Sequence, residues 1–210
     1  MVYNQCMRDP FNRRPFFFVA DCACLDFVNT QVVLEGRPVD LLGNFGDWIA
    51  WLVQAGLIGA DIGSRAMRKW EGRPAGKLAF EKALVFRSVL TRMAERIVRG
   101  GAIEDETIGR INELLCHGLG YTQVVRAATG FAKRVAVELI EPGQLVFPLA
   151  ESAANLLCGS DLALVKKCGN PQCVLYFYDT TKNHARRWCS MSICGNRMKV
   201  AAYYRRSHSR

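Results

Sequence analysis

The chain has 210 residues, of which half are hydrophobic, and a formal net charge of +9. This length suits one large domain or two small ones, with enough apolar residues for a packed core. No stretch approaches the roughly 18 uncharged apolar residues that a membrane-spanning helix needs, so we expect a soluble, cytoplasmic protein with no membrane partner. Paired arginines and phenylalanines near the N-terminus resemble an export signal, but acidic residues interrupt the apolar run, which favours mature protein.

The first 165 residues are predicted to be mostly helical, with one small sheet, because their hydrophobic residues recur mainly at helical spacing. The expected helices begin within 25–30 and then cover 44–58, 61–70, 77–99, 105–119 and 148–166. Asn44 is expected to cap the second of these helices, and Trp48 and Trp51 to lie in the core. Residues 121–128 and 133–140 are rich in β-forming side chains and predict a hairpin.

Three polar residues in apolar surroundings are candidates for a ligand pocket. Asp26 and Asn29 belong to the segment LDFVNT, and Arg87 interrupts the apolar stripe of the helix expected at 77–99. A buried Arg–Asp pair of this kind would line a pocket for a small acidic or polar effector. The alternative is an internal ion pair that only fixes helix packing.

The net charge is concentrated at one end of the chain. Ten of the 28 basic residues but only one of the 19 acidic residues lie from Lys166 to the C-terminus, so this segment carries the whole charge of +9. The remainder of the chain is neutral. This distribution predicts a binding surface for a polyanion.

Four cysteines of the same segment form two matching pairs, Cys168-x4-Cys173 and Cys189-x4-Cys194, separated by fifteen residues. Zinc binds four thiolates in a tetrahedron, and pairs with this spacing close around an ion at little entropic cost. Two disulfides, an iron–sulfur cluster, or His184 in place of one cysteine are the alternatives. The other cysteines are scattered in apolar surroundings, as in a reducing compartment, and we assign no function to Cys22 and Cys24, which are too close for an ordinary metal pair.

The residues around the cysteines predict a treble-clef-like zinc finger with four cysteine ligands. Residues 174–178 and 184–188 are expected to form its two strands, joined by turn residues 179–183, and residues 197–206 its helix. Val200 and Tyr203 or Tyr204 are expected to face that hairpin. Because the finger has little apolar content, zinc binding should supply on the order of 10 kcal/mol of its folding free energy. The fold class is therefore mainly α with a small β-hairpin, divided into a multihelical domain (1–165) and the finger (166–210).

The segments CGNPQC and FYDTTKNHARRWCSMSICGNRMKVAAYYRR resemble the CGNR zinc finger, whose name matches residues 194–197 here. Upstream, LDFVNT and DWIAWLVQAGLI resemble the ABATE domain that usually precedes this finger in bacterial proteins. The two resemblances cover nearly the whole chain. They imply that Cys168, Cys173, Cys189 and Cys194 hold one structural zinc ion, and that the protein is a transcription regulator whose finger binds DNA.

The basic residues of the finger are the candidates for nucleic-acid contact. They are Lys182, Arg186 and Arg187 on the expected hairpin, and Arg197, Lys199, Arg205 and Arg206 on the expected helix. Arg197 has an alternative role in bracing the metal site, and Trp188 is expected to pack under the finger. If about five phosphates are contacted, log affinity should fall against log salt with a slope near −4 to −5.

No nucleophile with a partnered base and no open metal site is present in the sequence, which argues against an enzyme. We therefore expect a DNA-binding regulator whose helical domain serves for sensing or dimerisation. RNA or an acidic protein is the alternative partner of the finger, and a homodimer would bring two fingers to one DNA site.

Overall fold

We describe the protein from a computed structural model, which covers residues 16–118, 120–127 and 129–207. The helices of this part of the chain are α1 (Ala23–Val28), α2 (Phe45–Gln54), α3 (Ala60–Trp70), α4 (Pro74–Val98), α5 (Asp105–Leu115), α6 (Phe147–Gly159) and α7 (Asn196–Ser207). The strands are β1 (Gln31–Leu34), β2 (Arg37–Asp40), β3 (Gly120–Ala127), β4 (Gly130–Val137), β5 (Val165–Lys167) and β6 (Tyr176–Tyr178). They form three separate antiparallel pairs, β1 with β2, β3 with β4 and β5 with β6. The predicted mainly helical fold is confirmed.

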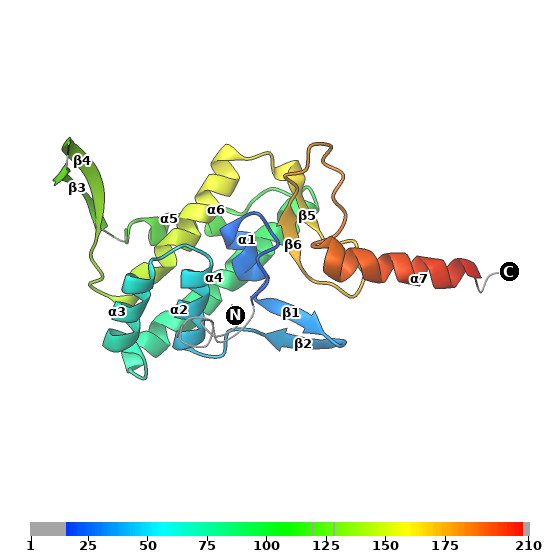
Figure 1. Ribbon diagram of the computed structural model, residues 1–210, viewed down its shortest axis with the longest axis horizontal. Coiled ribbons are helices and arrows are strands. Elements are labelled where there is room, and N and C mark those ends of the chain that lie inside the picture. The colour runs from blue at the N-terminus through cyan, green and yellow to red at the C-terminus, as the bar shows by residue number, and fades with distance from the viewer. Residues whose placement is uncertain (1–15, 119, 128, 208–210) are drawn as a thin grey trace.

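The long helix α4 is the centre of the core, and α1, α2, α3 and α5 pack against it (Figure 1). It begins at Pro74, which suits a first helical turn because no N–H is needed there. Trp48 and Trp51 of α2 are completely buried, as expected. Asn44 caps α2 by accepting a hydrogen bond from the backbone N–H of Asp47. None of the described helices combines the length and the apolar character that a bilayer crossing requires.

The hairpin of β1 and β2 was not predicted from the sequence. Its two strands are joined by Glu35 and Gly36, both in the left-handed region with φ of 51° and 77°. A two-residue turn of this kind matches the twist of paired strands, and glycine adopts it without strain. Residues 25–30 were expected to begin a helix, but α1 begins at Ala23 and ends at Val28, after which the chain continues into the hairpin.

The C-terminal strands also differ from the prediction. The helix expected at 148–166 ends at Gly159, after which Asp161 caps a short turn and β5 follows. β6 pairs with β5, which precedes the first cysteine of the cluster, and residues 184–188 form no strand. The prediction of a hairpin between residues 174–178 and 184–188 was wrong.

The cause is local, because Asp179 holds the segment after β6 in a compact loop. Its carboxylate accepts hydrogen bonds from the backbone N–H groups of Thr181 and Arg186 and from Lys166 Nζ. His184 in this loop has a φ of 48°, which is not a strand conformation.

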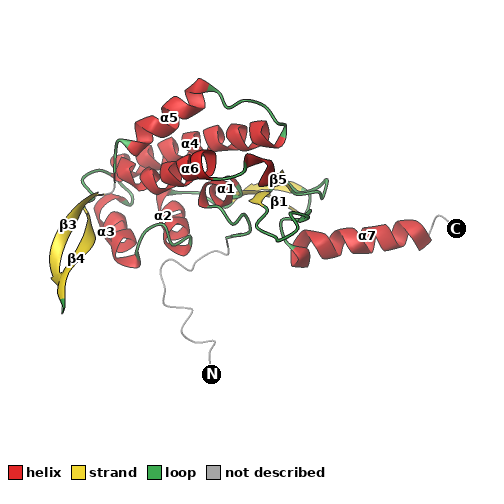
Figure 2. Cartoon of the chain, turned by 90° about the horizontal axis from the view of Figure 1, so that it is seen from above, coloured by secondary structure: helices red, strands yellow, loops and turns green. Residues whose placement is uncertain are grey.

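Two elements project from opposite ends of the molecule, the β3–β4 hairpin and α7 (Figures 1 and 2). The position of the β3–β4 hairpin agrees with the prediction for residues 121–140. The predicted packing of α7 was wrong: Val200, Tyr203 and Tyr204 are 55%, 65% and 58% exposed, because the helix points away from the rest of the protein.

Candidate metal centre

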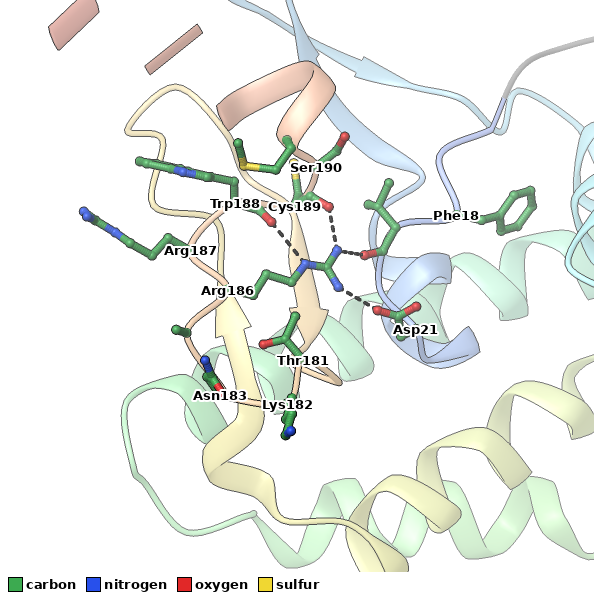
Figure 3. A pocket seen from close by; sticks show the side chains of 13 residues that line it. Phe18, Asp21, Thr181, Lys182, Asn183, Arg186, Arg187, Trp188, Cys189 and Ser190 are labelled. Carbon is green, nitrogen blue, oxygen red and sulfur yellow. Dashed lines mark hydrogen bonds and ion pairs between the residues drawn. The ribbon is translucent and has the colours of Figure 1, made fainter. Parts of the chain in front are cut away.

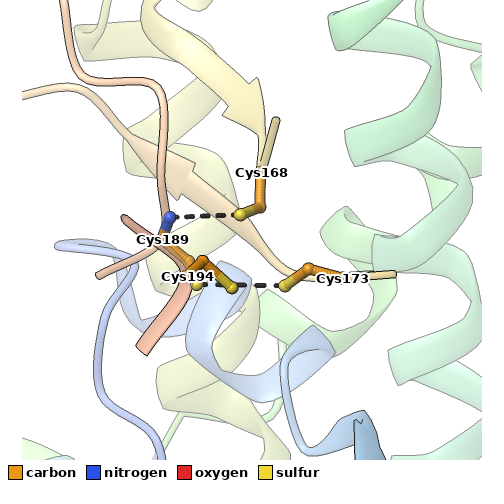
Figure 4. A group of neighbouring side chains, drawn as sticks. All are labelled: Cys168, Cys173, Cys189 and Cys194. Atoms are coloured by element: carbon orange, nitrogen blue, oxygen red, sulfur yellow. Dashed lines mark hydrogen bonds between the residues drawn. The ribbon is translucent and has the colours of Figure 1, made fainter. Parts of the chain in front are cut away.

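The four predicted cysteines lie together at the base of α7 (Figure 4). All four Sγ atoms lie within 4.8 Å of one another, and those of Cys173 and Cys189 are 3.9 Å apart. A tetrahedron with zinc–sulfur bonds of about 2.3 Å has edges of about 3.8 Å, so small side-chain movements bring the cluster to this geometry. His184 lies outside the cluster and bonds through Nδ1 to the backbone oxygen of Asp179.

Each cysteine is placed by a different piece of backbone. Cys168 follows β5, Cys173 lies in the loop before β6, and Cys189 ends the compact loop described above. Cys194 lies in a π-helical turn, Met191–Gly195, that leads directly into α7. The ligand set therefore ties both strands and the final helix to one point.

Hydrogen bonds to the sulfur atoms support this arrangement. Asn170 Nδ2 donates to Cys194 Sγ at 3.3 Å, and the backbone N–H of Cys189 donates to Cys168 Sγ at 3.4 Å. Asn170 is 3% exposed. Donors of this kind stabilise the negative charge of thiolates bound to a metal.

The thiols also share protons with one another. Hydrogen bonds from Cys173 and Cys189 lower the pKa of Cys168 to about 2, and donation to Cys168 raises the pKa of Cys173 to about 12. The same donation raises the pKa of Cys189 well above its ordinary value. A divalent cation at the centre of such a cluster replaces the shared protons and holds all four sulfurs as thiolates. The donor set and its geometry thus fit zinc.

The half-buried Trp188 ring lies beside two glycines, Gly169 and Gly195, each of which directly follows a cysteine of the cluster. Gly169 follows the first cysteine of the first pair, and Gly195 follows the second cysteine of the second pair. A Cβ atom on Gly169 would lie 3.1 Å from the Trp188 ring, and one on Gly195 would lie 2.6 Å from Met191 Sδ. These two glycines permit the close approach of the indole and the thioether.

The finger is bonded to the helical part of the chain along the outer edge of β6. Asn29, which is 2% exposed, donates from Nδ2 to the Tyr176 oxygen at 2.8 Å and accepts from the Tyr176 N–H at 2.9 Å. The N–H of Tyr178 donates to the oxygen of Ala20 at 2.8 Å. With β5 on its other edge, β6 is paired on both sides.

Arg186 forms a second link between the two parts (Figure 3). Its Nη1 lies 2.6 Å from Asp21 Oδ2, and its Nη2 donates to the backbone oxygens of Val19 and Cys189. Its Nε donates to the oxygen of Trp188 at 3.2 Å. The guanidinium of Arg186 is therefore engaged inside the protein, and we do not include it in a nucleic-acid surface.

Four of the other predicted cations of the finger face solvent. Lys182, Arg187, Arg197 and Lys199 are exposed, and none lies within ion-pair distance of an acid in the part of the chain that the structure describes. The guanidinium of Arg187 lies 5.1 Å from the centre of the Trp188 ring. The side chains of Arg205 and Arg206 lie outside the described residues.

An open groove of about 810 Å³ lies between the loop after β6 and the segment that precedes α1 (Figure 3). Lys182, Arg187, Trp188 and Phe18 are among its lining residues. The groove combines exposed cations with aromatic rings, which are the side chains that bind phosphates and stack on bases.

The three residues considered for a ligand pocket have internal partners. Arg87 pairs with Asp40, with Nη1 to Oδ1 at 2.9 Å and Nη2 to Oδ2 at 2.5 Å, and it forms no ion pair with Asp26. Asp26 Oδ1 accepts from the N–H groups of Val19 and Ala20, each at 2.9 Å. Burial raises the pKa of Asp26 to about 6. Together with the Asn29 contacts to Tyr176, this bonding favours the bridging alternative over a pocket.

Sequence reasoning missed Asn170 and Asp179, which organise the site, and Asp21, which anchors Arg186. Asp179 is completely buried and bonds Lys166 Nζ at 2.6 Å. Asp179 is the only acidic residue among ten basic residues in the segment from Lys166 onward. This isolation in the sequence indicates a structural role, because the carboxylate has many possible cationic partners. Asn170 lies between the cysteines of the first pair, where a donor to sulfur is expected.

These features define the class of the protein, a helical domain with a C-terminal four-cysteine zinc finger. Residues 21–160 match the family described as "Putative stress-induced transcription regulator", ABATE, and residues 165–207 match the CGNR zinc finger. Comparison with curated proteins gives no match. The chain therefore belongs to the ABATE family and carries a CGNR zinc finger. Its four C-terminal cysteines hold one structural zinc ion.

Proposed function

We propose that the finger binds duplex DNA through its exposed cations and that the protein regulates transcription by this contact, without catalysing a reaction. The observation that carries the proposal is the placement of charge. The whole net charge of +9 lies from Lys166 onward, and the single acid of this segment, Asp179, is buried in internal bonds. Phosphate groups can neutralise the cations of this segment that face solvent, which are Lys167, Lys182, Arg187, Arg197 and Lys199 among the described side chains.

The proposed contact surface runs from the groove to α7. Lys182 and Arg187 line the groove, and Lys199 lies on the exposed surface of α7. Arg197 lies beside the metal site, at a cavity that Cys173 and Cys194 also line. Because α7 stands clear of the rest of the protein, the helix has the access that a DNA groove requires.

The salt dependence of binding tests the proposal. Binding to a labelled duplex should weaken with salt, with a slope of log affinity against log salt near −4 to −5 for about five phosphate contacts. The triple variant Lys182→Gln, Arg187→Gln, Lys199→Gln should reduce this slope by about 3. A slope near zero for the unmodified protein would exclude a polyanion partner.

A matched control removes the same charge from the helical part. The control variant is Arg73→Gln, Lys82→Gln, Lys133→Gln, whose three side chains are also exposed. It should bind DNA with an unchanged slope. RNA, heparin and an acidic polypeptide serve as competitors: displacement by heparin at the same concentration as DNA would show nonspecific polyanion binding, and preferential displacement by RNA or by the polypeptide would identify the alternative partners.

For the helical domain we propose the role of a support that also holds two copies of the chain together, so that two fingers reach one DNA site. One finger is small compared with the roughly 1,000 Å² or more that specific DNA recognition buries. Sedimentation with and without duplex DNA tests this, and a monomer in both conditions would contradict it.

The binding of an effector at Asp26, Asn29 and Arg87 stays a prediction, to be tested by a thermal-shift screen of small metabolites with Arg87 variants. The division of the chain at residue 165 also stays a prediction.

A further inference from the structure

The sulfur atoms of Cys22 and Cys24 form a second, smaller cluster, remote in sequence from the metal site. Their Sγ atoms are 3.5 Å apart, and Cys22 Sγ lies 3.9 Å from Ser152 Oγ of α6. The same hydroxyl accepts a hydrogen bond from the Cys24 N–H at 3.0 Å. Two thiols are thus held side by side by a contact that joins α1 to α6.

The two thiols differ in exposure. Cys24 is 0% exposed, whereas Cys22 is partly exposed and lines an open cavity of about 460 Å³. The cavity is bordered by Ser152, Glu151 and Tyr178 among others. A small polar reagent therefore has access to Cys22, and the buried sulfur of Cys24 lies 3.5 Å from that of Cys22.

The two thiols also differ in ionisation. The hydrogen bond from the Cys24 thiol lowers the pKa of Cys22 to about 7, with further hydrogen bonds from backbone N–H groups and Ser152. Donating that bond and complete burial raise the pKa of Cys24 well above its ordinary value. Near neutral pH about half of the accessible sulfur is thus thiolate, the reactive form, and the buried sulfur keeps its proton.

We propose that Cys22 and Cys24 are an oxidation site for hydroperoxides, at which they form a reversible intramolecular disulfide. The Cys22 thiolate attacks one peroxide oxygen, so that an S–O bond forms and the O–O bond breaks, and the leaving hydroxide takes up the proton that the Cys22 thiol released to the solvent when it ionised. The sulfur of Cys24 then attacks the resulting sulfenic acid, so that the S–S bond forms and the S–O bond breaks. The leaving hydroxide takes the thiol proton of Cys24. In total, two thiols and one hydrogen peroxide give one disulfide and two water molecules.

Only a short movement is needed for this reaction. The sulfurs must approach from 3.5 Å to a disulfide bond length of about 2.05 Å, within reach of side-chain rotation. A disulfide that encloses a single intervening residue is strained, and strained disulfides are easily reduced by cellular thiols. The reaction is therefore suited to reversible modification. It does not depend on nucleic-acid binding by the finger.

Peptide mapping of the zinc-loaded, full-length protein tests the proposal. Reduced protein is treated with hydrogen peroxide near pH 7, quenched with catalase, alkylated and digested next to aspartate. This gives a peptide that contains Cys22 and Cys24 and no other cysteine. The peptide should lose two hydrogens and both alkylation sites, and dithiothreitol should restore them. A thiol with a pKa of about 7 is half ionised at pH 7, whereas a free thiol with a pKa near 8.5 is about 3% ionised. The loss should therefore need a peroxide dose about 15-fold lower than a free thiol needs, and it should precede modification of the exposed Cys116.

Two variants separate the roles of the sulfurs. Cys24→Ser should leave a sulfenic acid on Cys22 that dimedone labels, whereas Cys22→Ser should leave Cys24 unmodified. Cys158→Ser, at an exposed cysteine of α6, is the matched control and should behave as the unmodified protein. Full retention of both thiols when Cys116 is already oxidised, or a disulfide from either residue to a third cysteine, would overturn the proposal. If a variant does not fold, peptide mapping of the unmodified protein is sufficient to show whether the disulfide between Cys22 and Cys24 forms.

Discussion

Replacing Asn29 by alanine removes two of the three hydrogen bonds described above between the outer edge of β6 and the helical part of the chain, and leaves the bond from Tyr178 to Ala20. The Tyr176 N–H and carbonyl then lose their partners, at 2.9 and 2.8 Å, at a site where Asn29 is 2% exposed. Each buried backbone group left without a partner costs about 1–3 kcal/mol. We therefore expect Asn29→Ala to lower the free energy of unfolding by about 3 kcal/mol. For a chain of this size the melting temperature should fall by about 10 °C.

Urea unfolding of the zinc-loaded protein at a fixed free zinc concentration measures this change. Circular dichroism reports the helices, and a chromophoric chelator reports the release of zinc from the finger. If the two parts fold as one unit, both signals should follow the same transition in the unmodified protein. In Asn29→Ala both should move together to lower urea.

The control is Asn155→Ala, an asparagine exposed on α6, which should stay within about 0.5 kcal/mol of the unmodified protein. The reasoning is refuted if Asn29→Ala is as stable as this control. It is also refuted if only the zinc-release transition moves, because the finger would then fold independently of α1.

Three further predictions follow from the bonds described above. Arg186→Ala should lower the free energy of unfolding by about 3 kcal/mol, because the backbone carbonyls of Val19 and Cys189 lose their donor. Asp21→Ala should lower it by less than about 1 kcal/mol, because the Asp21 side chain of the ion pair is about half exposed. Equal losses for the two variants in urea unfolding would contradict this. Burial raises the pKa of Asp26 from 3.8 to about 6, so the folded state binds this proton more tightly than the unfolded state, and stability should fall as pH rises from about 4 to 6. In Asp26→Asn the loss of stability over this pH range should be about 3 kcal/mol smaller than in the unmodified protein. If the free energy of unfolding changes with pH equally in both proteins, Asp26 is not the group responsible. Extraction of zinc by a strong chelator should lower the melting temperature of the helical part as well as that of the finger, and an unchanged melting curve would rule out a structural ion.

The metal site could be predicted from the sequence because its information is local. Each pair of cysteines lies within six consecutive residues, and the spacing alone restricts the chemistry to a few choices. The glycines beside Cys168 and Cys194 are equally local. Helix α2 was predictable for the same reason, since its cap and its buried tryptophans share one short segment.

The contacts between distant segments could not be predicted. Arginine is a common phosphate-binding residue, so Arg186 was predicted to contact nucleic acid. Its bond to Asp21 instead joins positions 165 residues apart. Nothing in the sequence around Arg186 distinguishes it from Arg187, which is exposed. Likewise, β6 has the pattern of a strand, but its partners are β5 and Asn29, whose proximity depends on the packing of α1 beside α4 and β6.

The π-helical turn gives the final helix an unusual dependence on the ion. Cys194 lies within this turn, and α7 starts at Asn196, with the side chains of Val200, Tyr203 and Tyr204 more than half exposed. A helix of 12 residues is about 18 Å long, so a tilt of about 10° at its base moves its tip by about 3 Å. A small change in the geometry of the four sulfur ligands would therefore change the tilt of α7 at its base and produce a larger displacement at its C-terminal end.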